Sequence, residues 1–217
     1  MLCKRRFFQV SAMALLSVCA SCQTTGHKPL LSEAVIAAAA IYESPEDRQL
    51  VLKHQDSLNA IFQGIRKRFR PSKLEFFLIS GICFRKLQIK NRNDTYLSIN
   101  TRSSTTFKDG KTSFEKRAAS VFAEYSKPLL AIAASEKALL EDEDVAGIMI
   151  GTRWGVQKNI KDKYRYVTHE EMILVVRKQE IHEFVNDALT DQQLLDRSTV
   201  IALSESESPR ETTLTLE

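Results

Sequence analysis

The sequence has few of the residues that build fibrous, disulfide-rich or linker-dominated proteins. Its 217 residues include only seven Gly, five Pro and four Cys, which excludes collagen-like repeats and Pro-rich chains. It also lacks the glycine motifs of nucleotide-binding loops, the Gly-x-Ser-x-Gly frame of many hydrolases and the paired His spacing of a zinc site. No motif therefore indicates a catalytic residue, a cofactor or a metal, and the 43% hydrophobic and 27% charged composition is that of an ordinary globular domain.

The positive charge of the chain is concentrated at its start. The formal net charge is +4, from 31 Lys and Arg against 27 Asp and Glu. Without the first 21 residues, which contain Lys4, Arg5 and Arg6 and no acid, the net charge is only +1. Bulk nucleic-acid binding loses its main support, and we expect no nucleic-acid partner.

Residues 1–22 have the layout of an export signal. Three basic residues are followed by the largely apolar run Phe7–Val18, and the small residues Ala20 and Ser21 precede Cys22. Twelve helical residues span roughly 18 Å, which is shorter than the roughly 30 Å hydrocarbon core of a bilayer. The run is therefore predicted to be the apolar region of a signal peptide and not a permanent membrane span.

This segment resembles the signal peptide of bacterial lipoproteins, in which small residues precede a cysteine that receives a diacylglyceryl group. Ala20 and Ser21 match that pattern, whereas Cys19 stands where the family usually has Leu. The resemblance covers residues 1–22 only, and no family is recognised for the rest of the chain. It implies cleavage after Ser21, lipidation of Cys22 and export, and Gln23 favours the outer over the inner membrane.

We therefore expect a lipid-anchored protein of the cell envelope that acts by binding or assembly, with the membrane and an envelope protein as its partners. Two alternatives remain open. One is a soluble periplasmic binding domain with an ordinary cleaved signal peptide. The other is an envelope hydrolase of glycan or ester substrates, which would need His169 or His182 beside a carboxylate and a nucleophile.

The mature chain is predicted to be one α+β domain. Residues 1–21 are the signal peptide, 22–29 a short tether, 30–203 the domain and 204–217 a disordered acidic tail. Cys83 lies in an apolar run and is expected to be a buried free thiol, because the other cysteines are either removed or lipidated.

Hydrophobic periodicity gives the element order α-β-β-α-β-β-α-β, and we expect a two-layer sandwich of a mainly antiparallel sheet with helices on one face. Helices are expected over 30–42 and from Ser44 to a stop at Pro71, then from the cap Ser113 with a kink at Pro128, and in two short stretches within 180–195. Strands are expected over 74–89, 96–107, 145–156, 172–176 and 200–203, with turns at 91–94 and Asp109-Gly110 and a polar connection over 157–171.

The few candidate polar sites have structural explanations. His54, His169 and His182 are expected at the surface, and the acidic run 141–144 is expected to be a solvated loop that lacks the ligand spacing of a calcium site. Asp187 with Asp191 or Glu183 could form a carboxylate pair for glycan cleavage. Arg153-Trp154 could contact a partner, although a lone Trp is more often packed in the core.

The remaining candidate is a basic cluster at the end of one helix and on the following strand. If these elements converged, they would form a cationic face that attracts anionic headgroups. The candidate contacts are Arg66, Lys67, Arg68, Arg70, Arg85 and Lys86.

Overall fold

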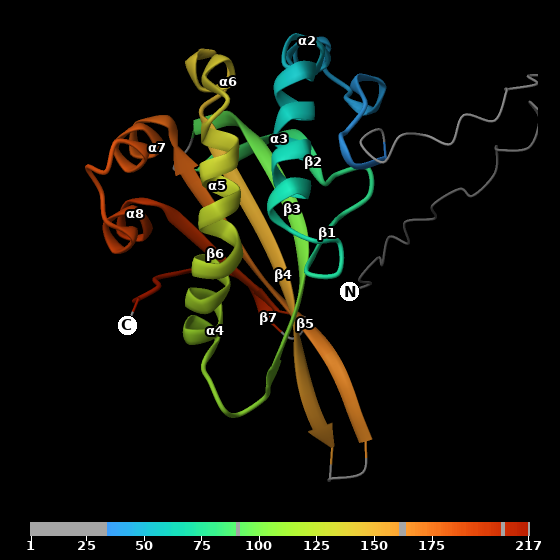
Figure 1. The fold of residues 1–217 in the computed structure, drawn as a ribbon, viewed down its shortest axis with the longest axis vertical. Coiled ribbons are helices and arrows are strands. Elements are labelled where there is room, and N and C mark those ends of the chain that lie inside the picture. Colours follow the sequence, from blue (N-terminus) through green and yellow to red (C-terminus); the bar gives the residue numbers. More distant parts are fainter. Residues whose placement is uncertain (1–33, 90–91, 161–163, 205–206, 217) are drawn as a thin grey trace, which may run out of the picture.

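The computed structural model describes residues 34–89, 92–160, 164–204 and 207–216 (Figure 1). The predicted signal peptide and tether lie outside these residues. The described chain belongs to the α+β class and contains a seven-stranded, mostly antiparallel sheet, as the sequence predicted.

The sheet has the strand order β1-β3-β4-β5-β6-β7, and β2 pairs with the same strand, β3, as β1 does. All pairs are antiparallel except β3 with β4, which run parallel because the chain crosses over through a helical segment between them. The strands are β1 (Leu74–Phe76), β2 (Ile82–Ile89), β3 (Arg92–Lys108), β4 (Gly147–Ile160), β5 (Tyr164–Arg177), β6 (Thr199–Ser204) and β7 (Glu207–Thr212).

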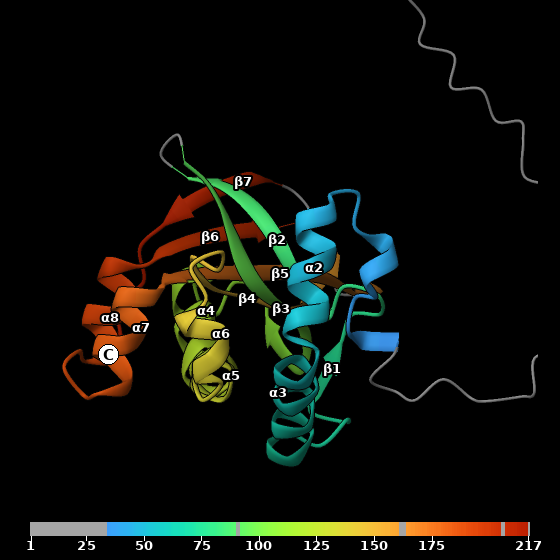
Figure 2. The same ribbon diagram turned by 90° about the horizontal axis from the view of Figure 1, so that it is seen from above.

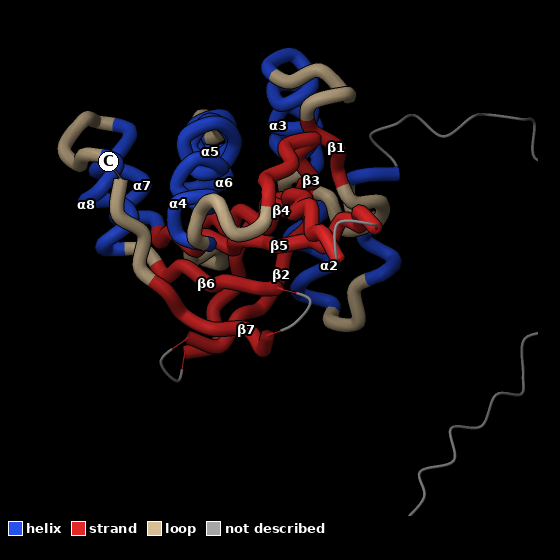
Figure 3. The backbone as a smooth tube through the Cα atoms, turned by 90° about the horizontal axis from the view of Figure 1, so that it is seen from below, coloured by secondary structure: helices blue, strands red, loops and turns tan. Residues whose placement is uncertain are grey.

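The helices pack against the sheet, as Figures 2 and 3 show. Between the two lies the main hydrophobic core, in which Ile61, Phe122 and Trp154 are fully buried. No helix in the described ranges is both long and apolar enough to cross a membrane. The helices are α2 (Pro45–Lys53), α3 (Gln55–Arg68), α4 (Phe114–Val121), α5 (Lys127–Ala134), α6 (Lys137–Glu141), α7 (Lys178–Val185) and α8 (Asp191–Arg197), with a short 3₁₀ turn η1 (Ala39–Ile41) and a π-helical turn η2 (Phe122–Ser126).

The N-terminal part of the domain differs from the prediction. Within the described residues, the expected helix over 30–42 is reduced to short turns, because the chain here bonds to the sheet: Ile36 bridges to Ile82, and the Ala37 N–H donates to the Ile82 carbonyl. The helix that begins at the Ser44 cap forms as predicted, with the Ser44 hydroxyl accepting from a first-turn N–H at 3.1 Å. It is interrupted at His54, where α2 ends and α3 begins.

The segment between β3 and β4 shows how the chain accommodates Pro128. Ser113 caps α4 as predicted. Ahead of the proline, the helix widens into the π turn η2, and the Lys127 N–H bonds the Phe122 carbonyl five residues earlier. This wider turn is the irregularity that the missing proline N–H imposes. The hairpin expected at Asp109-Gly110 is absent, because Gly110 (φ +73°) instead turns the chain from β3 towards α4.

Three strand predictions also differ. The single strand expected over 74–89 is divided into β1 and β2 by a loop at 77–81. The expected polar connection over 157–171 is largely strand, because Gly147–Ile160 of β4 pairs with Tyr164–Arg177 of β5 and the two strands satisfy each other's backbone groups. The described part of the expected disordered tail contains β7, which pairs with β6, and Leu214 is 2% exposed in the main core.

Candidate functional site

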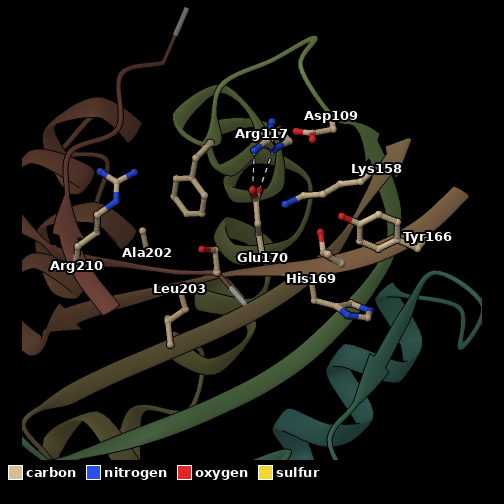
Figure 4. Close-up of a pocket in the computed structure, with 12 residues that line it drawn as sticks. Asp109, Arg117, Lys158, Tyr166, His169, Glu170, Ala202, Leu203 and Arg210 are labelled. Atoms are coloured by element: carbon tan, nitrogen blue, oxygen red, sulfur yellow. Dashed lines mark hydrogen bonds and ion pairs between the residues drawn. The ribbon is translucent and has the colours of Figure 1, made fainter. Parts of the chain in front are cut away.

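A cavity of about 390 Å³ opens where the start of α4 faces β5 and the ends of β6 and β7. Figure 4 shows side chains from these elements around it. Its charged and aromatic lining includes Asp109, Arg117, Lys158, Tyr166, His169, Glu170 and Arg210.

The floor of the cavity is a buried ion pair between α4 and β5. The Arg117 guanidinium donates two hydrogen bonds to the Glu170 carboxylate, from Nε to Oε2 at 2.9 Å and from Nη2 to Oε1 at 2.6 Å. Trp154 Nε1 donates to the same Oε2 at 3.0 Å, and Arg117 Nη1 donates to the Thr112 carbonyl. Since the Arg117 side chain is 7% exposed, this bidentate arrangement satisfies charges that would otherwise be costly to bury.

The local sequence places these groups. Glu170 is in phase along β5 with Met172 and Leu174, both buried in the core, so its side chain faces the helices. Arg117 lies in the first turns of α4 behind the Ser113 cap. The two elements thus bring the acid and the base together from positions 53 residues apart.

The rim of the cavity has an excess of positive charge. The charged lining residues are the cations Arg117, Lys158 and Arg210 and the acids Asp109 and Glu170, of which Arg117 and Glu170 pair with each other. Arg210 contacts Glu115 at 3.4 Å, but both side chains are well exposed, so water screens this pair strongly. In Figure 4 the Lys158 side chain extends towards Glu170, and the Arg210 side chain stands on the opposite side of the cavity. An entering acidic group would therefore meet cations from two sides.

The same cavity lies beside an open stretch of strand edge. β6 pairs with β5 only from Glu170 to Val175, so the described residues provide no strand partner on that side for residues 164–168. The ends of β4 and β5 project beyond the rest of the fold as a two-stranded ribbon (Figure 1). Tyr166 and Val167 on this ribbon are exposed large hydrophobic residues. An open edge with exposed apolar side chains can accept another extended chain.

The three histidines lie in separate parts of the fold. His169 lines the cavity, but its ring points away from the Arg117–Glu170 pair (Figure 4). His182 is exposed on α7. His54 was expected at the surface and is instead only 4% exposed, because it fills the junction between α2 and α3. Within the described ranges no group of three or more metal-ligating side chains is present.

His54 is buried against Asp142, one of the acids expected to be solvated. His54 Nε2 bonds Asp142 Oδ2, and Lys53 Nζ lies 2.8 Å from the same oxygen. Burial by itself raises the pKa of Asp142, but hydrogen bonds from Lys53, His54 and the Asp144 N–H outweigh it and lower the pKa from 3.8 to about 2. Lys178 Nζ donates to the Asp142 carbonyl. This cluster therefore ties the α2–α3 junction to the segment that leads into β4.

Two of the three carboxylates considered for glycan cleavage, Glu183 and Asp191, are paired with cations. Glu183 pairs with Arg197 at 2.5 Å, and Asp191 pairs with Lys127 at 2.7 Å. Asp187 adopts a positive φ of 57° in the turn after α7. Both carboxylates that were considered as partners of Asp187 are thus bound to cations.

The predicted basic cluster is divided between two distant places. Arg66, Lys67, Arg68 and Arg70 lie at the end of α3, where the Lys73 carbonyl accepts from Ser104 N–H on β3. Lys86 is aligned with Thr95 near the start of β3 and pairs with Asp47 at 3.3 Å. Ser104 and Thr95 are nine residues apart on β3, which corresponds to about 30 Å along the strand. The two halves do not converge on one cationic face.

Two other predictions are confirmed. Cys83 is a buried free thiol. Trp154 is fully buried, and its ring centre lies 5.5 Å from that of Phe114. It is therefore a core residue and not an exposed contact. The neighbouring Arg153 pairs with Glu171 at 2.9 Å on the other face of the sheet.

Sequence reasoning missed Arg117, Lys158, Glu170 and Arg210. A signal for Glu170 was present, since it continues the buried alternation of Met172 and Leu174 towards the N-terminus. It was overlooked because residues 157–171 were treated as a connection and not as a strand.

Comparison with known protein families, with curated proteins and with solved structures found no match to this chain.

Proposed function

We propose that this protein is a lipid-anchored component of the cell envelope that acts by binding a partner, with outer-membrane attachment facing the periplasm. The location is supported by the signal-like residues 1–21 and by Ala20 and Ser21 before Cys22. Acyl chains on Cys22 would each add about 0.8 kcal/mol of membrane affinity per buried CH₂.

The observation that carries the binding role is the cationic cavity beside the open edge of β5. Lys158 and Arg210 favour an acidic group, and the exposed Tyr166 and Val167 favour an extended apolar segment next to it. Both features suit an extended partner segment that adds to β5 and places a carboxylate in the cavity. We also propose that the domain is a two-layer sandwich, in which the helix layer fixes Arg117 against the sheet.

The anchor is tested by growing cells with radiolabelled palmitate and isolating the wild-type protein and Cys22→Ser. The label is expected on the wild type and absent from the variant. Label retained on Cys22→Ser would refute lipidation at this residue.

The binding role is tested by replacing Tyr166 with the photocrosslinker p-benzoylphenylalanine in living cells, with Val185 on α7 as the matched exposed control. A defined adduct is expected from position 166 and not from 185. It should disappear when Lys158→Glu and Arg210→Glu reverse the rim charge. Identical adducts from both positions, or an adduct that survives the charge reversal, would contradict binding at the cavity.

A further inference from the structure

A second exposed surface, on the loop between β1 and β2, suggests a membrane contact that rests on the proposed anchor. The loop Phe77–Gly81 presents Leu78 and Ile79 to solvent, 69% and 63% exposed. Aliphatic side chains this exposed at adjacent positions are unusual outside contact surfaces. We propose that this loop enters the headgroup region of the bilayer to which Cys22 is attached, and so fixes how the domain sits on the membrane.

The loop is held in place from both sides. The Phe77 N–H donates to the Asn100 carbonyl at 3.2 Å, and the Asn100 N–H donates to the Gly81 carbonyl at 2.7 Å. Asn100 Nδ2 also donates to the Ser80 carbonyl at 2.7 Å. A Cβ at Gly81 would lie 2.6 Å from the Phe77 carbonyl oxygen, so the close turn requires glycine. The two apolar side chains are therefore presented by a fixed loop.

Ile79 has a backbone conformation that its side chain disfavours. Its φ is +68°, and a β-branched residue in the left-handed region is strained. Strain of this kind is retained where the surrounding structure demands it, and is concentrated at contact and switch sites. Here it holds the apolar side chain outward.

The loop lies at the point where the anchor segment joins the domain. The Ile79 N–H donates to the carbonyl of Ala34, the first described residue, at 2.7 Å. Only residues 23–33 separate Ala34 from Cys22, and even fully extended they reach about 40 Å. The attachment therefore keeps the loop within reach of the bilayer surface.

The surroundings of the loop suit a bilayer with anionic headgroups. The guanidinium groups of Arg102 and of Arg153, which also pairs with Glu171, stand over the Phe77 ring, 5.8 and 4.8 Å from its centre. Along the segment after Ala34, Ile36 to Ala39 and the exposed Leu52 line a mostly apolar hollow of about 220 Å³. Apolar side chains bordered by cations are typical of a surface that lies in a membrane interface.

The test uses the full-length protein extracted from membranes and reconstituted in phosphatidylethanolamine–phosphatidylglycerol vesicles that contain lipids brominated on the acyl chains. Leu78→Trp and the control Val185→Trp introduce reporters at exposed sites, and the native Trp154 is buried in both. Thermal melts verify that both variants fold. We expect bromolipid to quench the Leu78→Trp signal by about half and to leave the Val185→Trp signal unchanged.

The intact mass of the same samples separates this proposal from the anchor. Acyl chains on the protein with no bromolipid quenching at position 78 would overturn the loop contact and leave the anchor standing. Quenching at position 78 of a protein without acyl chains would refute the anchor and support the loop contact. Equal quenching at positions 78 and 185 would also overturn it, because the contact would then be unspecific.

Discussion

Replacing Asp142 with Asn tests the buried cluster that joins the α2–α3 junction to the start of β4. The variant keeps the shape of the side chain and one acceptor oxygen but removes the charge that Lys53 and His54 stabilise. A pKa lowered from 3.8 to about 2 corresponds to about 2 kcal/mol of stabilisation at neutral pH. We therefore expect Asp142→Asn to lower Tm by about 4–8 °C at pH 7 for a domain of this size.

The pH dependence follows from the direction of the shift. The carboxyl of Asp142 has a lower pKa in the folded protein than in the unfolded chain, so its contribution is complete above pH 4 and is lost as the pH falls towards 2. Thermal melts followed by circular dichroism should show the full difference in Tm between wild type and variant at pH 5–7. The difference should shrink below pH 4.

The matched control is Asp144→Asn. Asp144 is exposed, and its backbone N–H, which donates to Asp142 Oδ1 at 3.1 Å, is retained in the variant. Its stability should stay within about 0.5 kcal/mol of the wild type. The reasoning is refuted if Asp142→Asn melts together with Asp144→Asn at pH 7, or if its Tm deficit is the same at pH 2 as at pH 7.

Three further variants test the ion pair of the site and two features elsewhere in the fold. Arg117→Met leaves the carboxylate of Glu170 without its buried cation and should lower the free energy of unfolding in urea by about 3–5 kcal/mol. A decrease below about 1 kcal/mol would show that the pair is dispensable. Gly147→Ala places a Cβ 2.1 Å from the Val176 carbonyl oxygen, so we expect a loss of about 1–3 kcal/mol in the same assay, and an unchanged midpoint would contradict this close approach. Thr190→Ala removes one half of the capping box of α8 and should lower the free energy of unfolding by about 1 kcal/mol. Amide exchange should become faster in that helix alone, and unchanged exchange in α8 would argue against the cap.

Local signals in the sequence predicted local structure well. Ser44 and Ser113 were identified as helix caps from a hydroxyl followed by acidic or helix-forming residues, and both accept the expected first-turn N–H. Thr190, between the two short helical stretches expected within 180–195, forms a complete capping box. These bonds join residues three apart, so the information needed to predict them lies in a few neighbouring positions.

Signals that depended on distant partners failed. Within the apolar run 74–89 only Ser80-Gly81 indicates a break, and the loop at 77–81 is fixed by Asn100 on another strand. The polar stretch 157–171 resembled a connection, yet β4 and β5 satisfy each other's backbone bonds along it. β7 forms in a segment whose composition indicated disorder, since β6 supplies its pairing partner.

The sequence by itself determined the features that neighbouring residues encode: the α+β class, the helix caps, the buried Cys83 and the lipoprotein-like pattern before Cys22. The tertiary structure alone decided which charges meet. It joined Arg117 to Glu170 and His54 to Asp142, and it separated the basic end of α3 from Lys86. The reason is physical, because whether a polar side chain is buried and paired depends on strands and helices far apart along the chain, and no local pattern carries that information.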